Sequence, residues 1–468
     1  MALKNKENIF FLFFFVSFFL SIANNFYQIK KFDNYSSYTS SEGAHHMITN
    51  DIEVFWREGD QIAKDIKNGK NYFETGGEYR RPYMPSRIFA FFSLITSENL
   101  LDENKKISLE NKKIIILIIQ SLIYYFILFF LYKKILFLFP DVVAKCTIFF
   151  LAFEPTIFMY HSSFLSESLF FSIQLCVIFF IIKKDQTKLS LLMFGLLLGL
   201  LYLQRSVAIF YTVPVLIYYY INNKENFLKF LTCISSGFII VLLLIGYHNY
   251  KRSGIFYVIS TQAKDGFHMY LLPEILAEKK KIKYAEAKKE LTNDLEKFVL
   301  EKKLNLNVAI NLKPDNEKDR RTFYDYQKKI AINMMIKNPL ITLKVIVKRT
   351  LSFVLIDPVA HVYYFHNWNI DDGPYYKSEQ HKMWLLPRIC YSLIIYFFCF
   401  IGAISVYKNE KHRSFLYYIL LSILYFIAVQ SWFGSTRYFS PIIIYLSFLF
   451  SFGILNFKKI IEKNLYKY

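Results

Sequence analysis

Cysteine is scarce in this sequence, and no cysteine lies in a polar stretch. The five cysteines all fall in apolar segments, and neither a CxxC pair nor a zinc-type spacing occurs: Cys146, Cys176, Cys233, Cys390 and Cys399. A disulfide framework and a cysteine-based metal site are therefore not expected. The sequence also lacks an internal repeat and a Gly-rich loop after a strand, so it offers no sign of a soluble nucleotide site.

Apolar and aromatic residues are abundant instead. Hydrophobic residues make up 54% of the chain and aromatic residues 19%, with 50 phenylalanines among them. They come in long blocks that a soluble domain of this size cannot bury, so lipid is their natural solvent. Lys and Arg (57) outnumber Asp and Glu (37), which gives a formal charge of +20. Much of this excess lies at the ends of apolar blocks, where it sets orientation, so no nucleic-acid partner is predicted.

About ten apolar blocks can be considered as membrane spans, although several are near the lower limit of length. They lie near residues 8–23, 113–137, 142–160, 163–182, 188–204, 206–222, 227–248, 384–407, 414–431 and 437–456. Because only helices and closed barrels satisfy their own backbone groups in lipid, these blocks predict an all-α polytopic membrane protein.

Basic residues alternate between the predicted short loops. The inner loops hold lysines such as Lys183 and Lys229, whereas the outer turn at residues 161–163 holds no Lys or Arg. The positive-inside rule then places both termini in the cytoplasm and the two long polar segments outside a plasma (inner) membrane. The predicted parts are a first span (1–23), outer loop 1 (24–112), a helical bundle (113–248), outer loop 2 (249–383) and C-terminal spans with an inner tail (384–468). A cleaved signal peptide over residues 9–23 is the alternative. We favour an uncleaved first span, because the loop that follows makes sense only if it stays attached to the membrane.

The second outer loop is expected to contain three helices. Residues 277–304 are dense in Lys and Glu and predict a solvated surface helix. A second helix is predicted over residues 320–337, and it should end at Asn338-Pro339. Residues 340–356 are amphipathic, with Lys344, Lys348 and Arg349 together and apolar residues opposite. We expect this third helix to lie in the outer interface, where Lys348 and Arg349 can meet an anionic substrate.

The first outer loop carries acids and arginines suited to chemistry at a membrane surface. Asp51 and Glu53 lie beside Phe55-Trp56, which suits an interfacial belt, and a carboxylate there can act as a general base. Arg80 and Arg81 precede Pro82, and guanidinium groups bind phosphate in parallel pairs. An ordinary solvated acid in a first helical turn is the alternative for Asp51.

Charged residues at the ends of spans are the remaining candidates. Glu167 begins a hydrophobic span, where an acid is either a functional group or a capping group at the helix N-terminus. Arg205 and Arg437 break the charge rule on the outer side, either as snorkelling side chains or as arginines that meet an anionic substrate. With Arg81 they predict a phosphate clamp. His45-His46 lacks a second ligand set, so no metal or other cofactor is predicted; a divalent metal is possible but not indicated.

These features together resemble the membrane-embedded GT-C glycosyltransferases, especially the protein O-mannosyltransferase and aminoarabinose-transferase branch (glycosyltransferase family 39). The resemblance covers most of the chain in layout. It is carried by Asp51 with Phe55-Trp56, Arg81-Pro82-Tyr83-Met84-Pro85, Phe153-Glu154-Pro155, Leu165-Ser166-Glu167, Gly195 to Arg205, Asn338-Pro339 and Arg437-Tyr438-Phe439-Ser440-Pro441. It departs from the family in having separated first-loop acids and Arg80 where an acid is expected.

The resemblance implies a polyprenyl-phosphate sugar donor, a first-loop Asp as catalytic base and basic residues that hold the lipid phosphate. The sequence therefore predicts a membrane glycosyltransferase acting on its outer face, with the sugar and the acceptor (lipid, glycan or protein) undetermined. Two alternatives stay open. A polysaccharide polymerase or ligase would use lipid-linked glycans and catalytic arginines of the late loop, and a lipid-linked substrate transporter would not be an enzyme.

Overall fold

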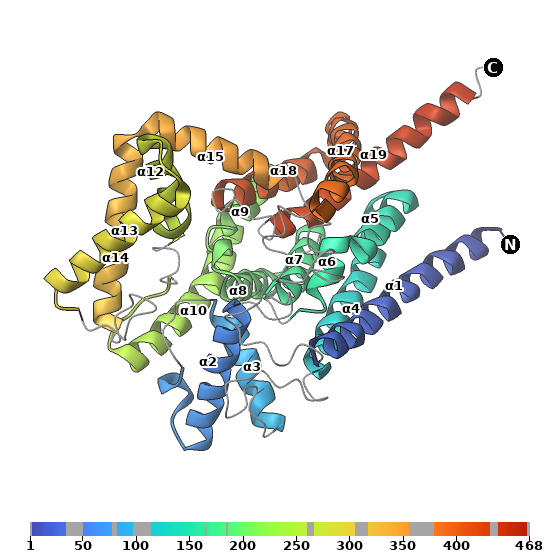
Figure 1. The fold of residues 1–468 in the computed structure, drawn as a ribbon. Helices are drawn as coiled ribbons and strands as arrows, with labels where there is room; N and C mark the ends of the chain where they lie inside the picture. Colours follow the sequence, from blue (N-terminus) through green and yellow to red (C-terminus); the bar gives the residue numbers. More distant parts are fainter. Residues whose placement is uncertain are drawn as a thin grey trace.

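The fold is a bundle of helices with two groups of shorter helices attached (Figure 1). The computed structural model describes residues 2–33, 50–76, 82–96, 114–163, 166–183, 186–259, 266–304, 317–354, 379–430 and 439–465. Its elements are α1 (Ala2–Asp33), α2 (Asn50–Lys67), η1 (Tyr72–Glu74), α3 (Tyr83–Thr96), α4 (Ile114–Leu138), α5 (Asp141–Phe153), α6 (Pro155–Tyr160), α7 (Glu167–Ile182), α8 (Lys188–Gln204), η3 (Ser206–Ala208), α9 (Thr212–Asn222), α10 (Phe227–Ser253), η4 (Phe267–Leu271), α12 (Leu272–Lys280), α13 (Tyr284–Glu301), α14 (Glu317–Lys337), α15 (Pro339–Val354), α17 (Glu379–Lys408), α18 (Glu410–Gln430) and α19 (Ser440–Leu465).

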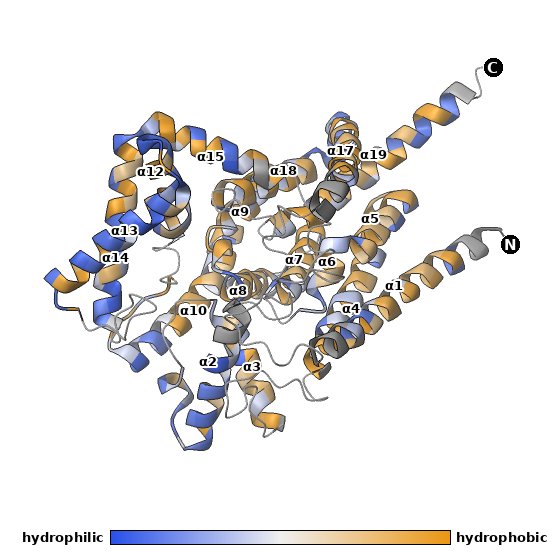
Figure 2. Cartoon of the chain, viewed as in Figure 1, coloured by the Kyte–Doolittle hydropathy of each residue, from blue (hydrophilic) through white to orange (hydrophobic). Residues whose placement is uncertain are grey.

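The chain is an all-α, multi-pass membrane protein, as its sequence predicts. Six of the described helices are long and apolar enough to cross a bilayer: α1, α4, α10, α17, α18 and α19. Each of the ten predicted apolar blocks contains helix among its described residues, with breaks at Glu154 and at residues 209–211 and with α7, α8 and α9 forming shorter apolar helices. In Figure 2 the bundle is mainly hydrophobic, whereas α2 and α13 carry hydrophilic stretches.

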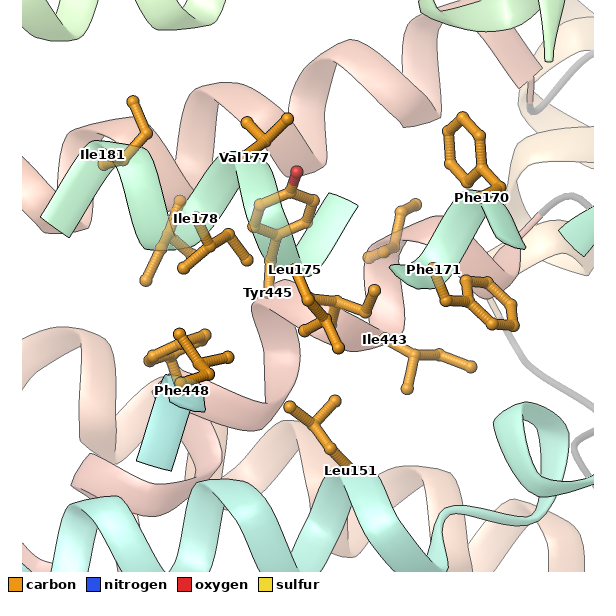
Figure 3. Close-up of a cluster of buried hydrophobic side chains, with 14 of the residues drawn as sticks. Leu151, Phe170, Phe171, Leu175, Val177, Ile178, Ile181, Ile443, Tyr445 and Phe448 are labelled. Carbon is orange, nitrogen blue, oxygen red and sulfur yellow. The ribbon is translucent and has the colours of Figure 1, made fainter. Parts of the chain in front are cut away.

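Close backbone contacts hold the bundle together. A Cβ atom on Gly195 of α8 would lie 2.1 Å from the carbonyl oxygen of Ile234 in α10, so only glycine allows the two helices to approach so closely. Figure 3 shows the apolar packing elsewhere, where side chains of α7 and α19 interlock beside Leu151 of α5. Packing of this density fixes the ends of the helices that carry polar side chains.

The first predicted outer loop folds back as a helical hairpin of α2 and α3. Phe55 and Trp56 are buried, and the Trp56 ring lies 5.8 Å from that of Phe89 in α3. This differs from the interfacial belt that the sequence predicts, because the two helices pack these rings inward on each other and on the bundle. Tyr83-Met84-Pro85 form the first turn of α3, where proline is well tolerated.

The second predicted outer loop forms a separate group of helices with its own apolar clusters (Figure 1). The break after Lys337 bends α15 by 105° relative to α14, as Asn338-Pro339 predicts. On α15, Leu340, Leu343 and Leu351 are exposed, which fits the apolar face expected of an interfacial helix. Its position at a membrane surface stays a prediction.

Candidate functional site

A seam of polar side chains runs through one end of the apolar bundle. It lies where the second half of α1, the start of α4 and the turn between α6 and α7 meet. The side-chain amides of Asn24 and Asn25 donate to the hydroxyls of Ser162 (2.9 Å) and Ser121 (3.1 Å). Polar groups in an apolar bundle are costly unless they are paired, so this seam marks a place where function is expected.

A buried ion pair lies beside this seam, between the start of α7 and the end of α8. The Arg205 Nη1 atom is 3.5 Å from Oε1 of Glu167, and the two side chains are only 5% and 0% exposed. Glu167 is the first residue of α7, where the positive end of the helix dipole favours its charge. The side chain of Gln204 donates to the Ser166 carbonyl oxygen at 2.8 Å and joins the two helix ends.

The ion pair defines what each partner can do. Because Glu167 faces the guanidinium group of Arg205, this geometry suits Glu167 to holding Arg205 in place. Arg205 has extended backbone dihedrals (φ −147°, ψ 120°) that end α8 and turn the chain into η3. Its guanidinium group is fixed and permanently charged, which suits it to stabilising an oxyanion.

Several buried polar atoms of the seam lack a hydrogen-bond partner within the described ranges. They are Oδ1 of Asn25, Oε1 of Gln120, Nε2 of His161 and Oε1 of Gln204. The other nitrogen of the His161 ring, Nδ1, lies 2.8 Å from the hydroxyl of Ser168, next to Glu167. Such atoms can accept or donate hydrogen bonds to a polar ligand that enters the seam.

The predicted residues of the first loop are placed only in part. Asp51 and Glu53 lie in the first turn of α2, immediately before the buried Phe55 and Trp56, so this end of α2 enters the bundle. The side chains of these two acids lie outside the described part of the structure, as do Arg80, Arg81 and Arg437. The base and the three-arginine clamp therefore stay predictions, and only Arg205 of the clamp is placed.

The two predicted cations of α15 contact acids of α12. Lys348 and Arg349 both bind Glu274, at 2.8 and 2.6 Å, and the neighbouring Lys344 binds Glu278 at 2.6 Å. Burial raises the pKa of the Glu274 carboxyl, but the hydrogen bonds from Lys348 and Arg349 outweigh it and hold that pKa below its usual range. In this arrangement the cations tie α15 to α12, and binding a substrate anion would require them to exchange partners.

Sequence reasoning missed a second charged pair, in the α2–α3 hairpin. Glu58 accepts hydrogen bonds from the Ser86 hydroxyl (2.7 Å) and from Nη1 of Arg87 (3.3 Å). The Arg87 guanidinium carbon lies 3.8 Å from the centre of the Tyr83 ring. The signal in the sequence was the Ser-Arg pair that follows Pro85, but its acidic partner becomes apparent only when the hairpin is formed.

Among the residues that the structure describes, no group of three or more His, Cys, Asp or Glu side chains is arranged to hold a metal ion. His45 and His46 lie outside those residues.

No protein-family model and no curated protein matches the sequence. Among solved structures, this chain is similar to the oligosaccharyltransferase AglB of Archaeoglobus fulgidus in complex with an inhibitory peptide and a dolichol-phosphate, at 13% identity and a TM-score of 0.45 over 88% of this chain and 47% of that one. The apo form of the Archaeoglobus fulgidus oligosaccharyltransferase gives 13% identity and 0.46 over 88% and 48%. The chain spans about half the length of these distant structural neighbours.

Proposed function

We propose that this chain is an integral membrane glycosyltransferase that moves a sugar from a polyprenyl-phosphate donor to an acceptor on the outer face of the membrane. The observation that carries the proposal is the buried Glu167–Arg205 pair beside a seam of incompletely bonded polar atoms, inside an otherwise apolar bundle. The family resemblance of the sequence supports the choice of donor.

The proposed reaction is a single displacement at the anomeric carbon. A hydroxyl or amine of the acceptor forms the new bond to that carbon, and its proton passes to Asp51 or Glu53 at the start of α2. The bond between the anomeric carbon and the phosphate oxygen breaks, and its electron pair leaves with the polyprenyl phosphate. Arg205, held by Glu167, stabilises the charge that develops on that oxygen, and Arg81 and Arg437 are proposed to assist it.

The test is a transfer assay with purified protein and a panel of defined polyprenyl-phosphate sugars, read as release of polyprenyl phosphate. Asp51→Asn keeps the shape of the side chain and removes its charge, so we expect turnover to fall roughly 10²–10⁴-fold with little change in donor binding. Glu53→Gln should have a milder effect. Asp65→Asn is a matched control on the same helix, because Asp65 binds Lys70 at 2.9 Å at the other end of α2.

Each alternative function predicts a different pattern. If Asp51→Asn and Glu53→Gln both transfer sugar normally, the first loop is not catalytic and a polymerase or ligase with late-loop arginines is favoured. If wild-type protein in sealed vesicles moves the lipid-linked sugar across the bilayer and releases no polyprenyl phosphate, the chain is a transporter. If the two first-loop variants exchange their effects, Glu53 is the base.

A further inference from the structure

Arginines from three distant segments gather on two tyrosines near the carboxyl end of α10. The guanidinium carbon of Arg87 in α3 lies 3.8 Å from the centre of the Tyr83 ring, and that of Arg321 in α14 lies 4.3 Å from the centre of the Tyr257 ring. Arg252 of α10 donates a hydrogen bond to the Tyr257 hydroxyl. The two tyrosines belong to one small apolar cluster. We call these five residues the arginine–tyrosine cluster.

A buried histidine lies against this cluster. His248 is 1% exposed, and its ring meets those of Tyr83 (5.2 Å), Tyr72 (5.8 Å) and Phe73 (6.2 Å). Neither ring nitrogen makes a hydrogen bond of ordinary geometry within the described part of the chain. The side chain of Asn249 is nearby but donates to the Tyr257 carbonyl oxygen at 2.8 Å. The aromatic rings thus surround an imidazole that has no well-aligned hydrogen bond among the described residues.

The arginines retain donors as well. The Nε atoms of Arg87 and Arg321 are buried and have no hydrogen-bond partner among the described residues. The Glu58 carboxylate pairs with the Nη1 atom of Arg87 and offsets its charge, but it does not bind the Nε atom of Arg87. A guanidinium group that stacks on a ring keeps its N–H groups at its edge, where they can donate in parallel to an oxyanion.

The location indicates where such an oxyanion would come from. His248 and Arg252 lie in the last two turns of α10, a helix long enough to cross the bilayer. The end of such a span is where lipid headgroups are expected. Arg321 reaches the same place from the outer-loop helix α14. A phosphate group fits this combination because it offers several strong acceptors to guanidinium and imidazole donors at once.

We propose that the arginine–tyrosine cluster, with His248, is a phosphate-binding site at the membrane surface, built from residues other than the Glu167–Arg205 pair. The phosphate is carried either by a lipid headgroup or by a soluble molecule, since both present the same oxygens. The site does not depend on the glycosyl transfer proposed above, and it binds whether or not that reaction occurs.

The experiment measures binding by the purified full-length protein in two arms. In the first, native mass spectrometry compares retention of phosphatidic acid with that of phosphatidylcholine. In the second, thermal unfolding in detergent compares inorganic phosphate with chloride at equal ionic strength. Preferential retention of phosphatidic acid identifies a headgroup site, and a phosphate-specific rise in Tm identifies a site for soluble phosphate. The absence of both effects overturns the proposal.

Two variants locate the binding. Arg321→Gln removes one charged donor and should weaken binding about tenfold, the scale of a lost charge-assisted hydrogen bond. His248→Phe keeps the ring, removes both nitrogens and should also weaken binding, so it decides the matter if Arg321→Gln fails to fold. Arg413→Gln is the matched control, because Arg413 also lies over a tyrosine, with its guanidinium carbon 5.1 Å from the centre of the Tyr407 ring. Wild-type affinity in both test variants, or equal weakening in the control, overturns the assignment.

Discussion

Breaking the Glu167–Arg205 pair from one side should destabilise the protein far more than removing both charges. Arg205→Met leaves the Glu167 carboxylate, which is 0% exposed, without the guanidinium group that now lies 3.5 Å away. Removing one partner of a buried pair typically costs about 3–5 kcal/mol, because a charge is stranded out of water. The double variant Glu167→Gln/Arg205→Met removes the stranded charge, and we expect it to recover most of that loss.

The measurement is a double-mutant cycle on thermal unfolding in detergent, with sugar transfer assayed on the folded variants. The double variant should be folded but slow, because it lacks the cation proposed to face the leaving phosphate. Arg413→Met is the stability control: its ion pair with Glu410 spans 3.7 Å with side chains 36% and 88% exposed, and such pairs contribute about 0–1 kcal/mol. A stable Arg205→Met variant would refute the burial argument, and a fully active double variant would remove Arg205 from the site.

The remaining predictions concern topology, pH and packing. Cysteines introduced at Lys70 and Lys280 should react with an impermeant thiol reagent in intact cells, whereas one at Lys188 should not; labelling at Lys188 would reverse the orientation. Because the folded pKa of Glu274 is depressed, its contribution to stability is present above the usual carboxyl pKa of about 4.5 and is lost as pH falls through the folded value. Hydrogen exchange in α12 and α15 should therefore rise at low pH in the wild type, and Glu274→Gln should show fast exchange at neutral pH already. Gly195→Leu should reduce the yield of folded protein, since even a Cβ atom there would lie 2.1 Å from a backbone oxygen of α10, and size-exclusion profiles will measure this.

The sequence was sufficient to predict the helices of the bundle, because long apolar blocks have few other outcomes in lipid. A local feature at Glu154-Pro155 can also be read in the sequence. There α5 ends, and the Glu154 carboxylate accepts a hydrogen bond from the Ile157 backbone N–H at 2.9 Å and caps α6. A local proline and a capping acid are visible in the letters, and so this feature could be anticipated.

What the sequence could not provide was the pairing of residues far apart in the chain. Glu167 and Arg205 each stood out as costly charges at span ends, but only the packing of α7 against α8 brings them together. Lys348 was correctly placed on one face of its helix, whereas its partner Glu274 lies on another element. The burial of Trp56 was missed for the same reason, since an aromatic residue beside acids has the same local pattern at an interface and in a core.

The glycine-lined contact between α8 and α10 has a consequence for the spacing of two arginines at the ends of these helices. Arg205 ends one of these helices and Arg252 lies in the last turn of the other. Because the helices touch through backbone atoms, no side chain can repack to let one slide past the other. The spacing of the backbone at these two arginines is therefore set by the main chain. Side-chain substitutions elsewhere in the core should leave that spacing unchanged.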